Sequence, residues 1–331
     1  MDTTRGGHRK VALASWPTPL EPAPRLAQAL GLGPDDLWIK RDDLIGLGGG
    51  GNKVRKLEWT CGQALAEGAR TLVTSGAPQS NHARLTAAAG ARLGMDTVLV
   101  LAGEPTDTAA GNLALDGLLG ARIVWAGSVG GTELAAVVDR VVAELRERDA
   151  APALIPFGGS SPVGALGYVD GGHELLAQAP DLATAVVALG SGGTMAGLVR
   201  ALAADRVLGV HCGAVPDPGH TLDLLLTDLY APSPAPRQRA LRLRVDQVGA
   251  GYSHLTEPVA EAVLLAARTE GLVLDPVYTG RAMAGLVAAV REGDIRPGER
   301  TVFIHTGGLP GLFGHQEALH RAGEVLAACT M

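Results

Sequence analysis

Residues 185–203 read AVVALGSGGTMAGLVRALA, and this stretch decides the fold class. Residues 185–189 are apolar on both faces, which is typical of a strand in a buried parallel sheet, and helical spacing follows over 195–203. A glycine turn between a strand and a helix directs unpaired backbone amides at an anion. Because Met195 occupies the third glycine position of the dinucleotide fingerprint, that motif is excluded. The stretch predicts a phosphate site, with an unliganded turn as the alternative, at Gly190, Ser191, Gly192, Gly193 and Thr194.

The same alternation of strand and helix patterns continues along the chain. Apolar runs predict strands over 71–74, 97–101, 122–125, 153–157, 185–189, 207–210 and 301–305. Helical spacing covers 54–67, 81–93, 134–148, 163–178, 195–203, 258–270 and 281–291. Residues 230–237, which contain three prolines and one serine, predict a surface loop. The alternation predicts an α/β fold with right-handed crossovers.

Composition excludes several classes of protein. A chain of 331 residues is long enough for two domains. The net charge is −6 and the basic residues are scattered, so we expect no nucleic-acid partner. No apolar run is long enough for a membrane span or a signal peptide. Cys61, Cys212 and Cys329 are far apart, which predicts neither a disulfide framework nor a metal site and favours a reduced, cytoplasmic setting.

A second motif places a lysine after four consecutive glycines, Gly48 to Gly51, and Asn52. Glycine lets the backbone approach a flat ligand closely, and Lys53 would stand at the start of a helix. The electropositive end of a helix disfavours a charged lysine, which lowers its pKa as Schiff-base chemistry requires. Asn52 excludes a Walker-type phosphate loop. A flexible glycine loop with solvated basic residues is the alternative.

Three further turns carry polar side chains where elements meet. Ser80, Asn81 and His82 follow the strand over 71–74, so that amides after Ser80 could hold a carboxylate; alternatively, Ser80 only caps its helix. His82 alone is more often a satisfied histidine than a catalytic one. The stretches 275–281 and 305–311 each place a hydroxyl residue in a turn, where ligand groups tend to bind.

Taken together, these motifs resemble the D-cysteine desulfhydrase and 1-aminocyclopropane-1-carboxylate deaminase family of fold type II pyridoxal-phosphate enzymes. The resemblance covers nearly the whole chain and rests on these stretches, in the family's order: 16–20, 40–43, 50–53, 80–82, 157–167, 190–194 and 305–308. It implies pyridoxal 5'-phosphate as cofactor and a tryptophan synthase β-like fold of two α/β domains, with parallel-rich open twisted sheets flanked by helices. Residues 1–52 plus 160–331 would form the large domain and 53–159 the small inserted one. It also implies a homodimer.

The resemblance assigns roles to individual residues. Lys53 would carry the cofactor and move the α-proton, and residues 190–194 would hold the phosphate. Asn81 would contact the phenolic oxygen of the cofactor. Ser80 would bind the substrate carboxylate and aid proton traffic. Tyr252 and Tyr278 would face the substrate. Asn81, His82 and Gly159 would lie beside the substrate. Thr279 or Thr306 would lie near the pyridine nitrogen.

The branch within the family is indicated by Thr279 and Thr306, where the deaminases have Glu and Leu. A hydroxyl beside the pyridine nitrogen supports a neutral ring, which suffices for loss of a good β-leaving group. We therefore expect α,β-elimination on a small, D-configured amino acid, converting D-cysteine to pyruvate, hydrogen sulfide and ammonia. Leu85 and the Ser253–His254–Leu255 stretch depart from the family pattern near the substrate side. A 1-aminocyclopropane-1-carboxylate deaminase, a cysteate sulfo-lyase and a non-catalytic sensor that binds the cofactor or an amino acid are the alternatives.

Overall fold

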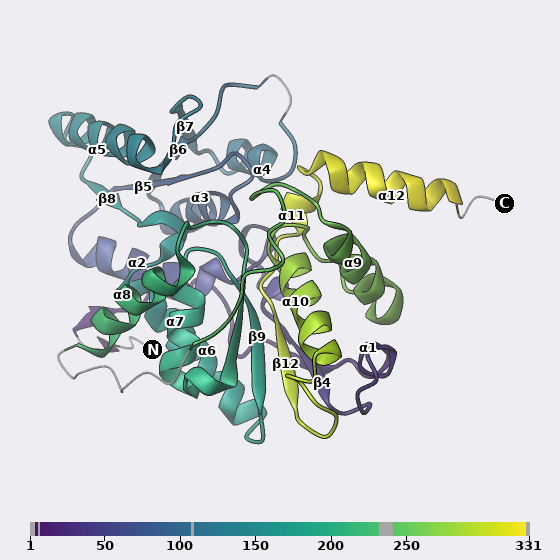
Figure 1. Cartoon of the computed structure of the whole chain (residues 1–331). Helices are drawn as coiled ribbons and strands as arrows, with labels where there is room; N and C mark the ends of the chain where they lie inside the picture. Colours follow the sequence, from purple (N-terminus) through teal and green to yellow (C-terminus); the bar gives the residue numbers. More distant parts are fainter. Residues whose placement is uncertain (1–3, 6, 107–108, 232–240, 329–331) are drawn as a thin grey trace.

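The computed structural model describes residues 4–5, 7–106, 109–231 and 241–328 (Figure 1). Its larger sheet has six strands in the order β11-β10-β9-β12-β4-β3, and only β3 runs antiparallel to its neighbour. The strands are β3 (Leu20–Pro22), β4 (Leu37–Arg41), β9 (Thr184–Leu189), β10 (Val207–His211), β11 (Arg242–Arg244) and β12 (Thr301–His305). The smaller sheet is fully parallel, in the order β7-β6-β5-β8. Its strands are β5 (Thr71–Gly76), β6 (Asp96–Leu101), β7 (Arg122–Trp125) and β8 (Pro152–Leu154), and β1 (Thr4–Arg5) and β2 (His8–Arg9) form a separate hairpin.

Helices cover both faces of each sheet, as Figure 1 shows. The α-helices are α1 (Pro24–Ala29), α2 (Lys53–Ala66), α3 (Asn81–Leu93), α4 (Asn112–Leu118), α5 (Gly131–Glu147), α6 (Pro162–Gln178), α7 (Gly193–Leu202), α8 (Pro218–Tyr230), α9 (Glu257–Glu270), α10 (Thr279–Arg291), α11 (Leu309–Leu312) and α12 (Gln316–Ala328). Four 3₁₀ turns are η1 (Asp42–Leu44), η2 (Leu47–Gly49), η3 (Phe157–Gly159) and η4 (Ala204–Arg206). No helix within the described ranges is both long enough and apolar enough to cross a membrane.

The strand residues explain why both faces are covered. Along β9, Val186 packs into a core with α1, α9 and α10, whereas its neighbours Ala185 and Val187 pack into a second core with α6 and α7. Alternate side chains of a strand point to opposite faces, so a strand that is apolar throughout needs helices on both sides. The predicted α/β class with parallel-rich sheets is therefore confirmed.

The predicted elements agree with the structure over most of the chain. The seven strands and seven helices expected from the pattern are all present, and β7, β12 and α3 have the expected bounds. The strand expected over 153–157 is wrong at its end, because β8 stops at Leu154 and Phe157 begins the turn η3. Of the loop expected over 230–237, Tyr230 instead closes α8, and residues 232–237 lie outside the described residues.

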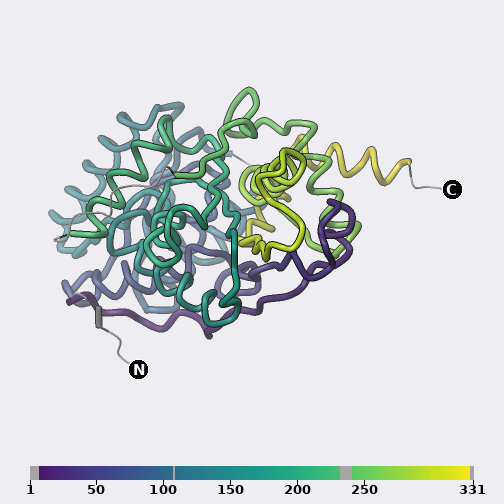
Figure 2. Tube along the Cα trace, turned by 60° about the horizontal axis from the view of Figure 1, so that its bottom comes forward, coloured from purple at the N-terminus to yellow at the C-terminus, as the bar shows by residue number. Residues whose placement is uncertain are grey.

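Strand β4, which lies between β12 and the edge strand β3 in the larger sheet, was not predicted. Its sequence, LWIKR, ends in two charged residues and therefore lacks the apolar pattern of a buried strand. The segment before it runs along one edge of the molecule from the N-terminal hairpin toward α1, in purple in Figure 2. It thereby passes both α2 and the larger sheet.

Cys61 and Cys212 are buried free thiols, and Cys329 lies outside the described residues.

Candidate active site

A cavity of about 220 Å³ lies where the two sheets face each other. It is lined by residues that follow the carboxyl ends of four parallel strands: Ala77 after β5, Ala102 after β6, Gly190 after β9 and Thr306 after β12. Ligands of open α/β sheets bind at this end of the strands, because loops and helix N-termini converge there. The position alone therefore marks the cavity as the candidate active site.

Lys53, the first residue of α2, lines this cavity and is surrounded by protein. Burial lowers the pKa of its ammonium group to about 8, so a substantial fraction of the amine is neutral near physiological pH. The preceding residue fixes its place: the backbone N–H of Asn52 donates to the carbonyl of Thr306 at 3.0 Å, and its side-chain amide donates to Thr194 Oγ1 at 3.0 Å. The lysine and the glycine turn, 137 residues apart in the chain, are thus brought together.

The predicted anion cradle lies across the same cavity, between β9 and α7. The backbone N–H of Gly193 donates to Ser160 Oγ at 3.0 Å, and the hydroxyls of Ser160 and Ser191 are 2.7 Å apart. A Cβ atom on Gly158, whose φ is +63°, would lie 2.0 Å from Ser191 Oγ. A Cβ on Gly193 would lie 2.7 Å from Ser160 Oγ. Gly158 needs glycine because of both its positive φ and this contact, and at Gly193 a side chain would displace Ser160. The small residues leave room for an anionic group beside the backbone.

Lys56 and Ser160 are cradle residues that the sequence reasoning missed. The fully buried Lys56 ammonium donates to the carbonyl of Gly158 at 3.2 Å and to Ser160 Oγ at 3.1 Å. Burial and the nearby charge of Lys53 lower its pKa well below the ordinary value. A buried cation without a carboxylate is costly unless an anion accompanies it, so the geometry suits a phosphate. The sequence spacing could have indicated Lys56, because it follows Lys53 by three residues on a helix and therefore shares its face.

The start of α3 supplies further polar side chains to the cavity lining. Ser80 Oγ accepts a hydrogen bond from the backbone N–H of Ala83 at 3.1 Å, so Ser80 caps the helix and also lines the cavity with Asn81 and His82. His82 Nε2 lies 3.0 Å from Thr74 Oγ1. Burial, together with the charges of Lys53 and Lys56, lowers the pKa of His82 well below its ordinary value. The imidazole is therefore neutral and contributes no positive charge to the cavity.

Two tyrosines close another side of the cavity. The hydroxyls of Tyr252 and Tyr278 are 2.5 Å apart, and the rings meet edge to face with centroids 6.0 Å apart. Burial raises the pKa of Tyr252 to about 12, and burial and the neighbouring Tyr252 raise that of Tyr278 well above its ordinary value. Both phenols remain protonated at neutral pH, and because one hydroxyl donates to the other, the pair has one hydroxyl proton left to donate elsewhere.

Some predicted site residues lie outside the cavity lining. Thr279 is buried, and its hydroxyl donates to Asp275 Oδ1 at 2.7 Å, whereas Thr306 lines the cavity. Gly159 and Gly193 lie behind the lining, and a Cβ on Gly159 would lie 3.2 Å from His82 Cε1.

The two departures from the family pattern also lie away from the cavity. His254 is half exposed in a separate surface groove, 4.0 Å from the Glu317 carboxylate. Leu85 packs in the core beneath α2.

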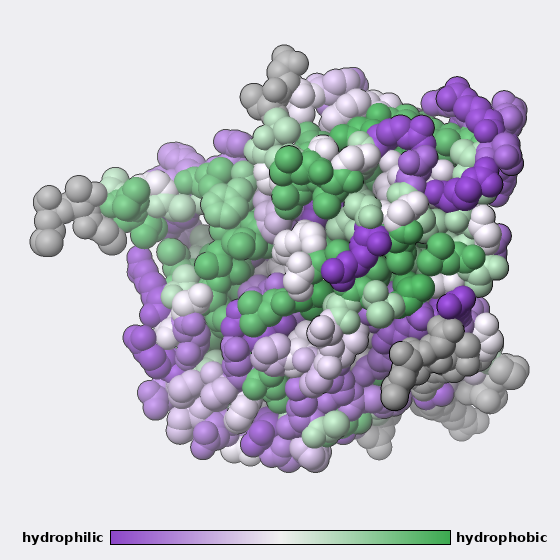
Figure 3. Space-filling model, turned by 180° about the vertical axis from the view of Figure 1, so that it is seen from behind, coloured by the Kyte–Doolittle hydropathy of each residue, from purple (hydrophilic) through white to green (hydrophobic). Residues whose placement is uncertain are grey.

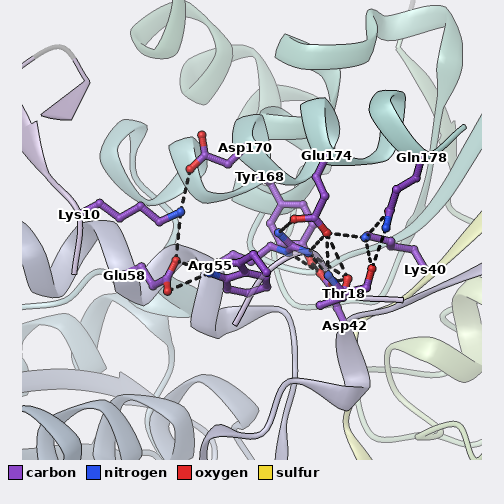
Figure 4. Close-up of polar contacts among 11 residues, drawn as sticks. Lys10, Thr18, Lys40, Asp42, Arg55, Glu58, Tyr168, Asp170, Glu174 and Gln178 are labelled. Carbon is purple, nitrogen blue, oxygen red and sulfur yellow. Dashed lines mark hydrogen bonds and ion pairs between the residues drawn. The ribbon is translucent and has the colours of Figure 1, made fainter. Parts of the chain in front are cut away.

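An ion network anchors α2 beneath the cavity (Figure 4). The buried Arg55 guanidinium donates twice to the Asp42 carboxylate and twice to that of Glu174, all at 2.9 Å. Tyr168 donates to Asp42, and Lys40 pairs with Glu174. Burial alone would raise the pKa values of both acids, yet the charge and hydrogen bonds of Arg55 hold them below their ordinary values. The network joins α2 to β4, η1 and α6, and so holds the helix that begins at Lys53.

Comparison with known proteins agrees with this geometry. Residues 11–307 match the family model described as pyridoxal-phosphate dependent enzyme. The chain is 39% identical to a candidate 1-aminocyclopropane-1-carboxylate deaminase of Pyrococcus abyssi, over 94% of each chain. It is 38% identical to a D-cysteine desulfhydrase of Klebsiella pneumoniae, over 94% of this chain and 97% of the relative. A crystal structure of an ACC deaminase homologue superposes with a TM-score of 0.86 at 37% identity, covering 94% and 96% of the two chains.

The cavity fits the cofactor that this match implies. Pyridoxal 5'-phosphate is a flat aldehyde with a phosphate at one end. The cavity offers a lysine of lowered pKa in the same lining as a glycine cradle, and a second, buried lysine lies beside that cradle. The family, the fold type and the cofactor that the sequence resemblance implies are all confirmed. The chain belongs to the pyridoxal-phosphate-dependent enzymes, in the family that includes 1-aminocyclopropane-1-carboxylate deaminase and D-cysteine desulfhydrase.

Proposed function

We propose that this enzyme catalyses α,β-elimination on a small amino acid with an uncharged side chain, D-cysteine being the first candidate. The observation that carries the proposal is that Lys53 lines one cavity with Gly190, Ser191, Gly192 and Thr194 of the cradle and is linked to the cradle through Asn52. The net reaction would consume D-cysteine and water and release pyruvate, hydrogen sulfide and ammonia. When bound, the cofactor supplies an electron sink for the pair left when the α-proton departs.

The chain's own residues would divide the remaining tasks. Lys53 Nζ holds the cofactor and, once substrate has displaced it, takes the α-proton; its pKa of about 8 suits proton transfer near neutral pH. The amides of 190–194 and the Lys56 ammonium bind the phosphate. Ser80 and the amides at the start of α3 bind the substrate carboxylate. Of the two protonated hydroxyls of Tyr252 and Tyr278, one donates to the other, and the remaining proton donates a hydrogen bond on the substrate side.

Thr306, rather than Thr279, is the hydroxyl proposed beside the pyridine nitrogen. Thr306 lines the cavity, while Thr279 is held by Asp275 away from it. A hydroxyl there leaves the ring neutral, which favours expulsion of a good β-leaving group over opening of a cyclopropane ring. This supports the desulfhydrase activity over the deaminase activity, although relatives of both names match the chain.

The charges that line the cavity support an uncharged substrate side chain. Lys53 and Lys56 are the two lysines of the cavity lining within the described residues, and the cofactor would engage both. Other residues that line the cavity, among them Ala102, Leu134 and Phe157, are uncharged. A sulfonate such as that of cysteate would find no cation there, and burying an unpaired anion is unfavourable.

The proposal is tested with purified protein and a substrate panel of D- and L-cysteine, β-chloroalanine, cysteate and 1-aminocyclopropane-1-carboxylate. We expect visible absorbance that borohydride abolishes, and pyruvate from D-cysteine. Lys53→Ala should lose both, whereas Lys10→Ala, which removes a lysine outside the cavity, should keep both. Normal turnover by Lys53→Ala would refute the proposal, and 2-oxobutanoate from the cyclopropane substrate without pyruvate from any cysteine would assign the deaminase activity instead.

We also propose that the enzyme is a homodimer. Large apolar side chains are exposed on and after α11 and on α12, among them Phe313 at 56% and Leu326 at 71%. Figure 3 shows apolar side chains gathered across the face seen from behind. Contiguous apolar surface of this kind marks association sites. Sedimentation equilibrium should give twice the chain mass, and a monomer at micromolar concentration would contradict this.

A further inference from the structure

The side-chain amide of Asn81 is held in one orientation by two donors. Its Oδ1 accepts from Asn112 Nδ2 at 2.9 Å and from the Arg84 guanidinium at 3.3 Å. Within the described residues, no acceptor is recorded for its Nδ2, and Asn81 lines the cavity. If the amide turned over, its NH₂ would face the NH₂ of Asn112 and a guanidinium, leaving donors opposite donors. The arrangement therefore presents an N–H donor to whatever occupies the cavity.

The two residues that hold Asn81 are themselves held firmly. Arg84 is fully buried and donates to the carbonyl of Gly48 at 2.7 Å, to that of Gly50 at 2.8 Å and to Asn112 Oδ1 at 3.0 Å. Asn112, also fully buried, is the first residue of α4. Arg84 thus links the glycine loop that precedes Lys53 to the start of α3.

We propose that Asn112 and Arg84 are positioning residues that lock the Asn81 amide so that its Nδ2 donates to the phenolic oxygen of the cofactor. The inference rests on the proposed function, because it takes Asn81 as the partner of that oxygen. A donor at the phenolic oxygen withdraws electron density that would otherwise hold the proton on the nitrogen joining Lys53 to the cofactor. The locked amide therefore lowers the pH at which that nitrogen loses its proton.

The test measures the visible absorbance of the holoenzyme as a function of pH. Asn112→Asp keeps an acceptor for Arg84 but replaces the donor to Asn81 by a carboxylate, so the Asn81 amide should turn over and present its oxygen to the cofactor. Loss of one hydrogen bond to a charged oxygen corresponds to about one pKa unit or more. We expect the titration midpoint to rise by about that amount in Asn112→Asp, and by less in Asn112→Ala.

Two comparisons separate positioning from a general loss of stability. Asn81→Ala should raise the midpoint by itself, and adding Asn112→Asp to it should cause no further shift, because both act through one amide. Leu113→Ala, which removes a largely buried apolar side chain from the same helix, should lower the urea midpoint of unfolding and leave the absorbance titration unchanged.

Each outcome bears on the inference. An unchanged midpoint in both Asn112 variants, or an additive shift in the double variant, would overturn it while leaving the proposed function standing. If Asn81→Ala caused no shift, the contact with the phenolic oxygen and the inference would both be refuted. If the wild-type protein lacked a band that borohydride abolishes, the proposed function would fail first and this inference with it.

Discussion

Replacing Asp42 by asparagine tests whether the ion network under α2 holds the active-site helix. The carboxylate is 1% exposed and accepts from Arg55 Nε and an Arg55 terminal nitrogen at 2.9 Å, from Thr18 Oγ1 at 2.8 Å and from the Tyr168 hydroxyl. Asparagine has nearly the same shape but only one acceptor oxygen. Its NH₂ must therefore face at least one of these donors.

The magnitude follows from these contacts. Removing one member of a buried ion pair costs about 3–5 kcal/mol, because the remaining charge loses its partner in a medium of low dielectric constant. Arg55 would keep its two hydrogen bonds to Glu174, each 2.9 Å long, which compensates part of the loss. We therefore expect Asp42→Asn to lower the free energy of unfolding by about 3 kcal/mol, the lower end of that range.

Urea unfolding followed by tryptophan fluorescence measures this change. The ring centroid of Trp16 lies 4.0 Å from the Arg55 guanidinium carbon, so its emission reports on the network. Asp149→Asn is the matched control, since it breaks an ion pair to Arg70 in which the two side chains are 62% and 98% exposed, and should change stability far less. If the two variants lost equal stability, the argument that the network anchors α2 would be wrong.

The remaining predictions concern acid, the cofactor and the two threonines. Folding lowers the pKa values of Asp42 and Glu174, so the stability that these carboxylates contribute is present above about pH 4 and is lost as the pH falls. The free energy of unfolding of Asp42→Asn should therefore decrease less steeply with falling pH than that of the wild-type protein. Gly158→Ala should weaken binding of pyridoxal 5'-phosphate by at least about tenfold, measured by dialysis, because its Cβ would meet a side chain at 2.0 Å; unchanged affinity would contradict the cradle. Lys56→Gln should weaken binding of the phosphorylated cofactor but not of pyridoxal. Thr306→Ala should shift the absorption maximum of the holoenzyme, whereas Thr279→Ala should lower stability by about 1 kcal/mol through its lost bond to Asp275 and leave the maximum unchanged.

Local patterns predicted the parts of the fold in which each segment carries its own signal. The 185–203 stretch gave a strand, a glycine turn and a helix, and these are β9, the cradle and α7. Strand β4 was not predicted because it ends in the charged residues Lys40 and Arg41. In the structure, Lys40 pairs with Glu174, which is far away in the sequence, and Arg41 pairs with Glu21 and Asp43. The sequence alone does not show whether a charged residue is paired inside the fold or exposed to solvent.

The site residues that stand in local sequence motifs were predicted, whereas those that only the fold brings together were not. Lys53, Ser80 and Tyr278 stand in motifs and line the cavity as expected. Ser160 was missed, because its hydroxyl enters the cradle from the segment after η3, and only the folded chain brings it to Gly193. The choice between Thr279 and Thr306 also needed three dimensions, since each stands in a similar turn. The domain boundary at 52/53 and 159/160 stays a prediction, because the two sheets alone do not test it.

The two hydrogen bonds of Asn52 have a consequence for how substrate enters. They fasten the start of α2 to both α7 and the loop after β12, so the floor on which the cofactor would rest behaves as a single block. Any opening of the cavity would then involve its other lining elements, among them the loop after β6 with Ala102 and helix α5 with Leu134. Substrate admission and cofactor retention would thus be governed by different parts of the chain, and a variant that loosens the loop after β6 or α5 should speed exchange of amino acid without releasing the coenzyme.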